Sequence, residues 1–441
     1  MGPFERFAAR ETSGGLVLLL CAVAAVVWAN SRWAGAYHHL WETEFVLGAG
    51  TTVARFTLHQ AINDGLMVVF FFLVGLEIKR EILVGELASL KQAALPIAGA
   101  LGGMVVPAAL YWMLNPGGPG ARGWGIPMAT DIAFALGVLA LLGSRVPTSL
   151  KIFLAALAIA DDIGAVLVIA LFYSAGVHWM AIGVVVALLV LALAANGAGV
   201  RKTYPYAILG VAMWLAVIAS GVHATIAGVL LAFTIPSRTR IHEGEFLARA
   251  RAALRRFDLA LQDVPAGGPT TVQTNTESQE AIHTLEKLCE QAQTPLHRLE
   301  HSLHGVVALG IMPLFALANA GVSLRGDLLA AFGSSVTLGI MLGLVLGKPI
   351  GITLVAWMAV KSGLAAKPAD VTWRALHFVA WLGGIGFTMS LFVSNLAFVG
   401  PEAPALLDSA RLGVFTASIV AGLVGYLMLR AGPGAAADKV R

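Results

Sequence analysis

The run AALAIADDIGAVL, residues 155–167, places two adjacent carboxylates, Asp161 and Asp162, in the middle of an apolar segment. A charged residue at the centre of a membrane helix costs about 2.5–3.5 kcal/mol on insertion scales. Packing alone therefore gives no reason for two acids side by side in such a run. They predict a site whose chemistry needs negative charge inside a membrane-spanning helix.

The composition of the 441-residue chain is that of a membrane protein. Hydrophobic residues make up 58% and charged residues 12% of the chain, and the mean hydropathy is +0.81. Soluble domains carry about 25% charged residues, so a water-facing surface is excluded. The 29 Lys and Arg residues do not cluster on one soluble face, so we expect no nucleic-acid partner. The lipid bilayer is the expected surrounding.

Apolar blocks of about 20 residues, the length that crosses about 30 Å of hydrocarbon, predict twelve spans. These are residues 14–30, 60–77, 93–114, 123–143, 149–173, 179–195, 204–220, 222–235, 303–322, 335–360, 373–398 and 405–429. The stretch 204–235 is long for one crossing and short for two. Basic residues at both of its ends, and the break at Ser220–His223, favour two crossings.

Charge bias orients these spans. With twelve crossings both termini share a side, and 23 of the 29 Lys and Arg residues then lie on that side. Five lie on the opposite side, and Lys348 lies within a span. The positive-inside rule therefore predicts that both termini are cytoplasmic.

Four parts are predicted along the chain: residues 1–236 as the N-terminal half of the bundle, 237–301 as a cytoplasmic insertion, 302–430 as the C-terminal half, and 431–441 as a cytoplasmic tail. Within the insertion, 243–262 and 280–293 have helical apolar spacing, and 263–278 is a Pro, Gly and Thr linker. A helical tether between the two halves is the simpler interpretation. A regulatory or lipid-surface role is the alternative.

Asp131, Asp161, Asp162 and Lys348 lie well inside predicted spans. Unpaired, they would together cost on the order of 10–14 kcal/mol. A buried ion pair with Lys348 would still leave two carboxylates unexplained. Neighbours on a helix point about 100° apart, so one of Asp161 and Asp162 is expected to face a water-filled cavity and the other a packed helix. Carboxylates with added hydroxyl or carbonyl oxygens suit a hard cation, and protons compete for the same oxygens.

Two spans contain helix breakers. Residues 123–131 (GWGIPMATD) lie in the fourth span and residues 381–388 (WLGGIGFT) in the eleventh. Backbone groups freed inside a membrane must be satisfied within the protein. Such interruptions predict inverted-topology repeats, here spans 3–5 and 10–12, with a site near the midplane. If the broken helices cross, Asp131 would offset N-terminal dipoles and Lys348 would offset C-terminal ones. Close packing is the alternative role of the glycines.

Five segments surround these charges and helix breakers: MATDIAFALG (128–137), AIADDIGAVLVIALFYS (158–174), MPLFALANAGVSL (312–324), LGKPIGI (346–352) and LGGIGFTMSLFVSNLAF (382–398). They resemble the NhaA family of bacterial sodium/proton antiporters. The resemblance extends from about residue 10 to 430. It implies an all-α polytopic protein of the bacterial inner membrane, with twelve transmembrane helices, inverted repeats and two discontinuous crossing helices, spans 4 and 11.

The resemblance also implies a function: electrogenic exchange of sodium or lithium for protons by alternating access, serving pH and sodium homeostasis. Asp162 resembles the principal Na⁺ ligand, and Asp161 its companion and the ion-pair partner of Lys348. Thr130 resembles a further oxygen donor, and Asp131 and Lys348 the charge compensators. Lys348 is also a candidate proton carrier. No enzymatic activity and no cofactor are implied, and a homodimer through residues 31–59 is a candidate assembly.

A pH-sensing region is implied at the cytoplasmic side. The matching positions are Glu77, Arg80, Glu81, Arg298, Glu300, His301 and His304, and His223 matches a further family histidine. The alternative is that these residues only form the solvated ends of helices. The insertion at 237–301 is longer than in compact members of the family and flanks this region.

Three rival functions remain. A sodium-coupled solute symporter would need a pocket for an organic solute, yet no Arg lies in the middle of a predicted span to hold an acid group. An intramembrane aspartyl protease needs two Asp on different helices sharing a proton, whereas here two are adjacent. A passive channel would conduct without proton coupling.

Overall fold

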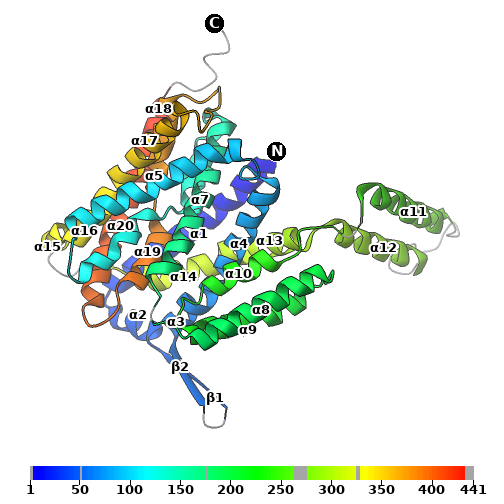
Figure 1. Cartoon of the computed structure of the whole chain (residues 1–441), viewed down its shortest axis with the longest axis horizontal. Coiled ribbons are helices and arrows are strands. Elements are labelled where there is room, and N and C mark those ends of the chain that lie inside the picture. The colour runs from blue at the N-terminus through cyan, green and yellow to red at the C-terminus, as the bar shows by residue number, and fades with distance from the viewer. Residues whose placement is uncertain are drawn as a thin grey trace, which may run out of the picture.

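A computed structural model of the chain describes residues 3–49, 52–174, 176–239, 241–262, 276–323 and 328–432. Helices dominate it (Figure 1). The first part contains α1 (Pro3–Asn30), α2 (Ala34–Trp41), β1 (Glu44–Ala49), β2 (Thr52–Thr57), α3 (Leu58–Gln60), α4 (Met67–Val84), α5 (Leu90–Leu114), α6 (Ile132–Leu141), α7 (Thr148–Phe172), α8 (Trp179–Gly197), α9 (Thr203–Ser220) and α10 (Ile226–Thr234). The second contains α11 (Glu243–Gln262), α12 (Thr276–Ala292), α13 (Pro295–Val306), α14 (Met312–Asn319), α15 (Leu328–Gly333), α16 (Ser335–Leu342), α17 (Lys348–Lys361), α18 (Trp373–Leu382), α19 (Phe387–Ala397) and α20 (Ala403–Ala431). Short π-helical turns at 61–66, 307–311 and 343–347 join α3 to α4, α13 to α14 and α16 to α17, and 3-10 turns occupy 119–128 and 143–145.

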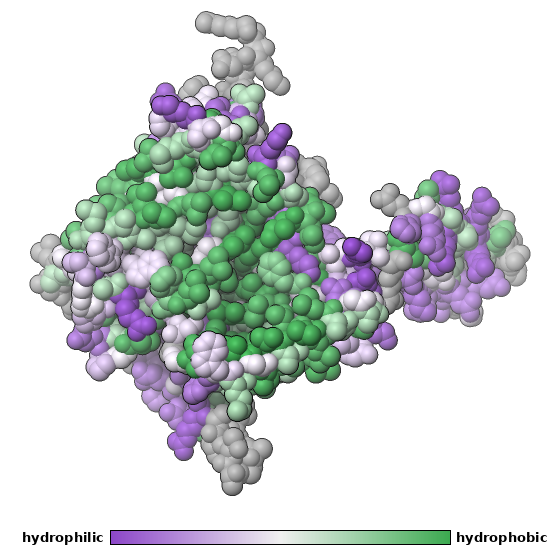
Figure 2. Space-filling view, in the orientation of Figure 1, coloured by the Kyte–Doolittle hydropathy of each residue, from purple (hydrophilic) through white to green (hydrophobic). Residues whose placement is uncertain are grey.

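Eight helices in the described residues are long and apolar enough to cross a membrane: 58–84, 90–114, 148–172, 179–197, 203–220, 295–319, 335–361 and 403–431. Three bent pairs raise the number to at most eleven: 14–30 with 34–41, 119–128 with 132–141, and 373–382 with 387–397. Large apolar side chains such as Trp179 and Met180 of α8 are exposed, and Figure 2 shows apolar surface across this face of the bundle. The predicted class, an all-α polytopic membrane protein, is confirmed.

The region predicted as the eighth span is shorter than expected. Helix α10 has nine residues, about 14 Å at 1.5 Å per residue, which is too short to cross a bilayer by itself. Helix α9 ends at Gly221, whose φ of 79° lies in the left-handed region that glycine adopts without strain. Helix α10 packs against α4 and α9, so this short helix is a buried part of the bundle.

A two-stranded antiparallel hairpin departs from the purely helical prediction. Strands β1 and β2 pair from Glu44 opposite Thr57 to Ala49 opposite Thr52. The rings of Phe45 and Phe56 stack across the strands with centroids 5.9 Å apart. The hairpin projects from the bundle at the end opposite the N-terminus (Figure 1). The alternation of apolar and polar residues that indicates a strand extends over only six residues in each strand. It is therefore too short to predict a hairpin between two membrane spans.

Helices α11 and α12 occupy most of the described part of the segment 237–301, which the sequence predicts as an insertion. They lie side by side and project away from the bundle beyond α13 (Figure 1). Ala253 and Ala260 of α11 and Ala281 and Leu288 of α12 are buried in this pair. Helix α12 begins at Thr276, inside the stretch predicted to be linker, and residues 263–275 lie outside the described residues.

The ninth span begins earlier than predicted. Instead of starting at residue 303, the helix begins at Pro295 and continues through the π turn 307–311 to Asn319. Thr294 caps it by accepting a hydrogen bond from the His297 amide, and Pro295 fits the first helical turn. The first three turns are amphipathic, so average hydropathy places the start too late.

Both predicted interruptions are present in the fold. The 3-10 turn 119–128 and α6 meet at 41°, and α18 and α19 meet at 54°. The preceding α5 is held tightly against α17 at a glycine crossing. A Cβ built on Gly102 would lie 2.0 Å from the carbonyl oxygen of Gly351, and one on Gly351 would lie 2.1 Å from that of Gly102. The two backbones touch there, one turn from Lys348, so this crossing positions the lysine.

The Gly351→Ala variant is expected to lower thermal stability, because the added methyl group must push two backbones apart. Overpacking of this kind costs about 1–3 kcal/mol. The measurement is the thermal unfolding midpoint in detergent. The matched control is Gly183→Ala in α8, where a Cβ meets nothing within 4 Å. Equal midpoints for the two variants would contradict the role of the crossing.

Candidate functional site

The two interrupted helices touch at their breaks. The Asp131 amide donates to the Ile385 carbonyl at 2.7 Å, and the Thr130 hydroxyl donates to the Gly383 carbonyl at 2.9 Å. The Ser390 hydroxyl donates to the Ile126 carbonyl at 2.8 Å. Each break therefore satisfies backbone groups of the other, as a bilayer interior requires.

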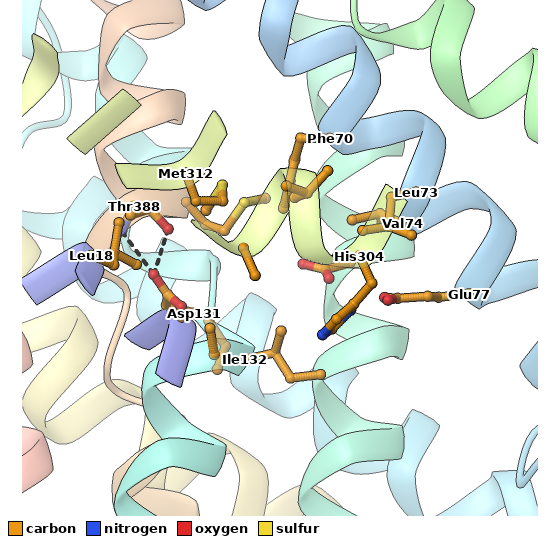
Figure 3. A pocket seen from close by; sticks show the side chains of 17 residues that line it. Leu18, Phe70, Leu73, Val74, Glu77, Asp131, Ile132, His304, Met312 and Thr388 are labelled. Carbon is orange, nitrogen blue, oxygen red and sulfur yellow. Dashed lines mark hydrogen bonds between the residues drawn. The ribbon is translucent and has the colours of Figure 1, made fainter. Parts of the chain in front are cut away.

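Asp131 lies where two helices begin. Its Oδ1 accepts the Phe134 amide at 3.3 Å and so caps α6. Its Oδ2 accepts the Thr388 amide at 3.1 Å and also the Thr388 hydroxyl, at the start of α19 (Figure 3). The positive ends of two helix dipoles thus face one carboxylate. This is the geometry expected of a charge compensator.

Asp161 faces the packed interior. Its Oδ2 lies 2.6 Å from the Lys348 ammonium, and both side chains are almost wholly buried. Lys348 also donates to the Thr130 hydroxyl at 2.8 Å. Asp161 Oδ1 has no hydrogen-bond partner among the described residues. The pair joins α7 to α17, and Thr130 ties both to the break of the fourth span.

Asp162 faces the other way. It lines a cavity of about 60 Å³ together with Thr130, Asp131, Glu77 and His304. Figure 3 shows Asp131 and Thr388 at one side of this cavity and Glu77 and His304 at the other. Adjacent residues on a helix point about 100° apart, and this places one acid on a lysine and the next on a cavity. The cavity reaches from Asp131 and Thr388 to Glu77 of α4 and His304 of α13. The end of the bundle with the N-terminus and the α11–α12 hairpin is called here the α11–α12 end (Figure 1).

The donor set in this cavity suits a hard, exchangeable cation. It combines the carboxylates of Glu77, Asp131 and Asp162 with the hydroxyl groups of Thr130 and Thr388, all oxygen donors. Within the described residues no group of three or more His, Cys, Asp or Glu side chains could hold a resident metal ion. The arrangement can therefore accept either a proton or a small cation on Asp162, and in this structure the neighbouring Asp161 is paired with Lys348.

The residues predicted to sense pH occupy three different positions: an ion-pair bridge between α4 and α13, the wall of the cavity, and the exposed side of α13. Arg80 of α4 bridges Glu300 of α13 at 2.6 Å and Glu81 at 2.9 Å. Glu77 and His304 line the cavity one to two turns further in. Arg298 lies on the exposed side of α13, 3.5 Å from Glu290 of α12, and His301 is exposed and stacked near His297. These positions all lie toward the α11–α12 end.

His223 lies apart from that group. Its Nδ1 is 2.8 Å from the Thr225 hydroxyl, and its Nε2 is 3.6 Å from Asp64. Its ring packs edge-on against Phe392, with centroids 5.6 Å apart. The structure therefore does not bring His223 together with Glu77, Arg80 or Glu300.

Sequence reasoning missed Thr388, which binds Asp131 through both its amide and its hydroxyl. It also missed the buried amides Asn63 and Asn319. The available signal was weak. A threonine directly after a glycine-rich break is a helix-start signal, and polar residues facing other spans are a known sign of function in membranes.

Two interrupted spans cross beside two buried acids, of which Asp161 is paired with Lys348 and Asp162 lines a cavity. A helical membrane protein with this arrangement belongs to the class of ion-coupled secondary transporters. Comparison with known proteins specifies the family. The family model described as Na+/H+ antiporter 1 matches residues 5–429. The chain therefore belongs to the Na+/H+ antiporter 1 family.

Individual relatives agree along nearly the whole chain. A protein of Oleidesulfovibrio alaskensis named Na(+)/H(+) antiporter NhaA is 50% identical over 98% of this chain and 94% of its own length. Proteins of the same name from Koribacter versatilis and Acidithiobacillus ferrooxidans are 49% and 48% identical over 97% of this chain, and over 91% and 97% of their own lengths.

The Lys348→Ala variant is expected to be strongly destabilised, because Asp161 is left as an uncompensated buried charge. Removing one partner of a buried pair costs about 3–5 kcal/mol. Thermal unfolding in detergent checks this. The double variant Asp161→Asn/Lys348→Met removes both charges and should recover most of the loss. A double variant no more stable than Lys348→Ala would contradict the pairing argument.

Proposed function

We propose that the protein is an electrogenic antiporter that extrudes Na⁺, or Li⁺, in exchange for protons. The observation that carries this proposal is that the two adjacent acids have different surroundings. Asp161 is paired with Lys348, whereas Asp162 lines the cavity. Membership of the Na+/H+ antiporter 1 family supports it. Two protons entering per Na⁺ leaving would drive export with the proton-motive force.

In the proposed cycle Na⁺ and protons bind alternately to the same carboxylate oxygens. Asp162 is the principal ligand, and Asp161 and Thr130 are the further oxygens beside it. Na⁺ binding from the cavity displaces a proton from Asp162 and draws Asp161 away from Lys348, which then loses a proton. When the site opens to the other side, protons rebind and Na⁺ leaves. Asp131, between the starts of α6 and α19, keeps the crossing electrically balanced throughout.

We further propose the topology in which this exchange is directional. The chain crosses the bacterial inner membrane twelve times with both termini cytoplasmic, and spans 3–5 and 10–12 are inverted repeats. The twelfth crossing, beyond the eleven that helix length supports, is the short α10 together with the residues that flank it. The α11–α12 end is then the cytoplasmic end and the β1–β2 end is external. The bias of Lys and Arg residues supports this orientation. The two bundle halves, 1–236 and 302–430, are tethered by the insertion, and the β1–β2 hairpin within 31–59 is the candidate dimer contact.

The Asp162→Asn variant is expected to lose sodium-dependent proton exchange entirely, because the amide neither binds nor releases a proton at this position. The measurement is the collapse of ΔpH in energised everted membrane vesicles from an antiporter-deficient strain, pulsed with Na⁺, Li⁺ and K⁺ between pH 6.5 and 9. Asp258→Asn in the exposed α11 is the matched control and should behave as the unmodified protein.

Three outcomes would overturn the proposal. No response of the unmodified protein to Na⁺ or Li⁺ at any pH would exclude sodium antiport. Cation flux without proton movement would indicate a channel. Full exchange by Asp162→Asn would remove this carboxylate from the site.

We also propose that Glu77, Arg80, Glu81, Glu300, His301 and His304, with Arg298 at their edge and His223 at a separate position, regulate activity by pH. The bridge from Arg80 to Glu300 and Glu81 joins α4 to α13 at the mouth of the cavity. Changing its charge would alter how these helices close.

The Glu300→Gln variant is therefore expected to shift the pH of half-maximal exchange while leaving the maximal rate near that of the unmodified protein. The same vesicle assay, run as a pH profile, measures this. Glu286→Gln on the exposed face of α12 is the matched control. Unchanged profiles in both variants would contradict regulation at the bridge.

A further inference from the structure

Two helices carry the same order of side chains toward the β1–β2 end. In α14 the order is Met312, Phe315 and Asn319, and in α19 it is Met389, Phe392 and Asn395, each step about one helical turn. The second span adds Phe71 of α4 and, about two turns further toward that end, Asn63 in the π turn 61–66. The two methionines line the cavity that Asp162 faces.

The phenylalanines form the first closed layer. The ring of Phe392 lies 5.3 Å from that of Phe71 and 6.1 Å from that of Phe315, centroid to centroid. All three side chains are at most 1% exposed. This layer lies about one helical turn from the two methionines that line the cavity, toward the β1–β2 end.

The asparagines form the second layer. The Oδ1 of Asn319 accepts the Asn395 amide at 2.7 Å and faces the His59 Nε2 at 2.9 Å. The amide of Asn319 donates to the Asn63 Oδ1 at 3.1 Å and to the Phe315 carbonyl at 2.9 Å. Asn319 is 1% exposed, so it is the centre of a buried network that joins three helices.

A second cavity begins directly beyond this layer. It has a volume of about 250 Å³ and is lined by His59, Ala318, Tyr37 and Arg411, among others. From Met389 to Asn395 is six residues, or about 9 Å along a helix. Two layers of side chains thus separate the cavity of Asp162 from a cavity at the β1–β2 end.

One hydrogen bond in the second layer differs from the rest. Asn319 lies on α14, which packs against α1 and against the π turn 61–66 that holds Asn63. Asn395 lies on α19, which packs more extensively against α20 and the 119–128 turn than against α14, and which begins at Asp131. In the proposed antiport cycle the crossed helices move as a unit against the remaining spans. The Asn395–Asn319 bond crosses that boundary, and the Asn63–Asn319 bond does not.

We infer that the Asn395–Asn319 hydrogen bond is the latch that keeps the β1–β2 end closed, and that it breaks each time the ion site opens toward that end. Asn395 is a positioning residue: it holds Phe392, one turn away on the same helix, over the cavity. This inference rests on the proposed function, because it needs a site that opens alternately to two sides. A bond that only stabilised the fold would stay intact through the cycle.

The first experiment cross-links the latch. In a background with Cys21→Ser and Cys289→Ser, the pair Asn319→Cys/Asn395→Cys is treated with a short bis-methanethiosulfonate reagent in everted vesicles. Because the two amides meet tip to tip, a short bridge fits better than a direct disulfide. Sodium-dependent ΔpH collapse is expected to fall at least about tenfold from the variant's own value, and to return with reductant, since a locked site cannot alternate.

The matched control is Asn63→Cys/Asn319→Cys, which bridges the same layer without crossing the boundary. Cross-linked to the same extent, it is expected to keep its exchange activity. Full activity of the cross-linked Asn319→Cys/Asn395→Cys pair would overturn the latch. Equal loss in both pairs would also overturn it, because the layer would then be a general structural element.

A second measurement does not depend on sodium transport, so it separates failure of the latch from failure of the proposed function. Met389→Cys in the same background is labelled with a membrane-impermeant maleimide applied to the β1–β2 side. Adding Asn395→Leu should raise the labelling rate about two- to tenfold, the population shift that losing one hydrogen bond produces. Asn63→Leu is the control and should leave the rate unchanged. An unchanged rate with Asn395→Leu, or an equal rise with both variants, would overturn the inference.

Discussion

The contact between Asp161 and Lys348 is the constraint on which the site depends. A lysine and a carboxylate with almost no exposure are each too costly to leave alone inside a bilayer. Together they are tolerated, and their pairing fixes α7 against α17. The same pairing removes Asp161 from the cavity and leaves Asp162 there. A site that must exchange ions thus contains one acid held by the fold and one acid left free to react.

Close backbone approach makes that contact possible. Gly102 and Gly351 let α5 and α17 touch one turn from Lys348, so the ammonium enters the interior at a defined depth. The breaks of the fourth and eleventh spans then surround it. Their hydrogen bonds to one another, through Asp131 and Thr130, satisfy backbone groups that a continuous helix would have satisfied internally. The irregular backbone exists only where protein, not lipid, surrounds it.

The two faces of the site are closed by different means. Toward the α11–α12 end, charged residues such as Glu77 and the Arg80–Glu300 bridge surround an open cavity. Toward the β1–β2 end, phenylalanine and asparagine layers close the path. Charged side chains can be hydrated and so attract ions, whereas aromatic rings exclude water. Amides form hydrogen bonds strong enough to hold a closed state and weak enough to break in each cycle.

The sequence by itself determined the class of protein and the charged members of the site. Composition identified the bilayer as solvent, breakers located the interrupted spans, and the cost of charge in hydrocarbon singled out Asp131, Asp161, Asp162 and Lys348. These features could be predicted because each is a local violation of what a membrane helix tolerates. Average hydropathy placed the start of the ninth span too late, because the helix that begins at Pro295 is amphipathic there. It also predicted a longer helix for the eighth span than the short, buried α10. The residue pattern left open which acid pairs with Lys348; the family resemblance implied Asp161, and the structure shows that pair. Only the tertiary structure decided that Thr388 completes the Asp131 contact and that Asn319 joins three helices. Those choices depend on the crossing geometry of helices far apart in the chain, which local residue patterns do not encode.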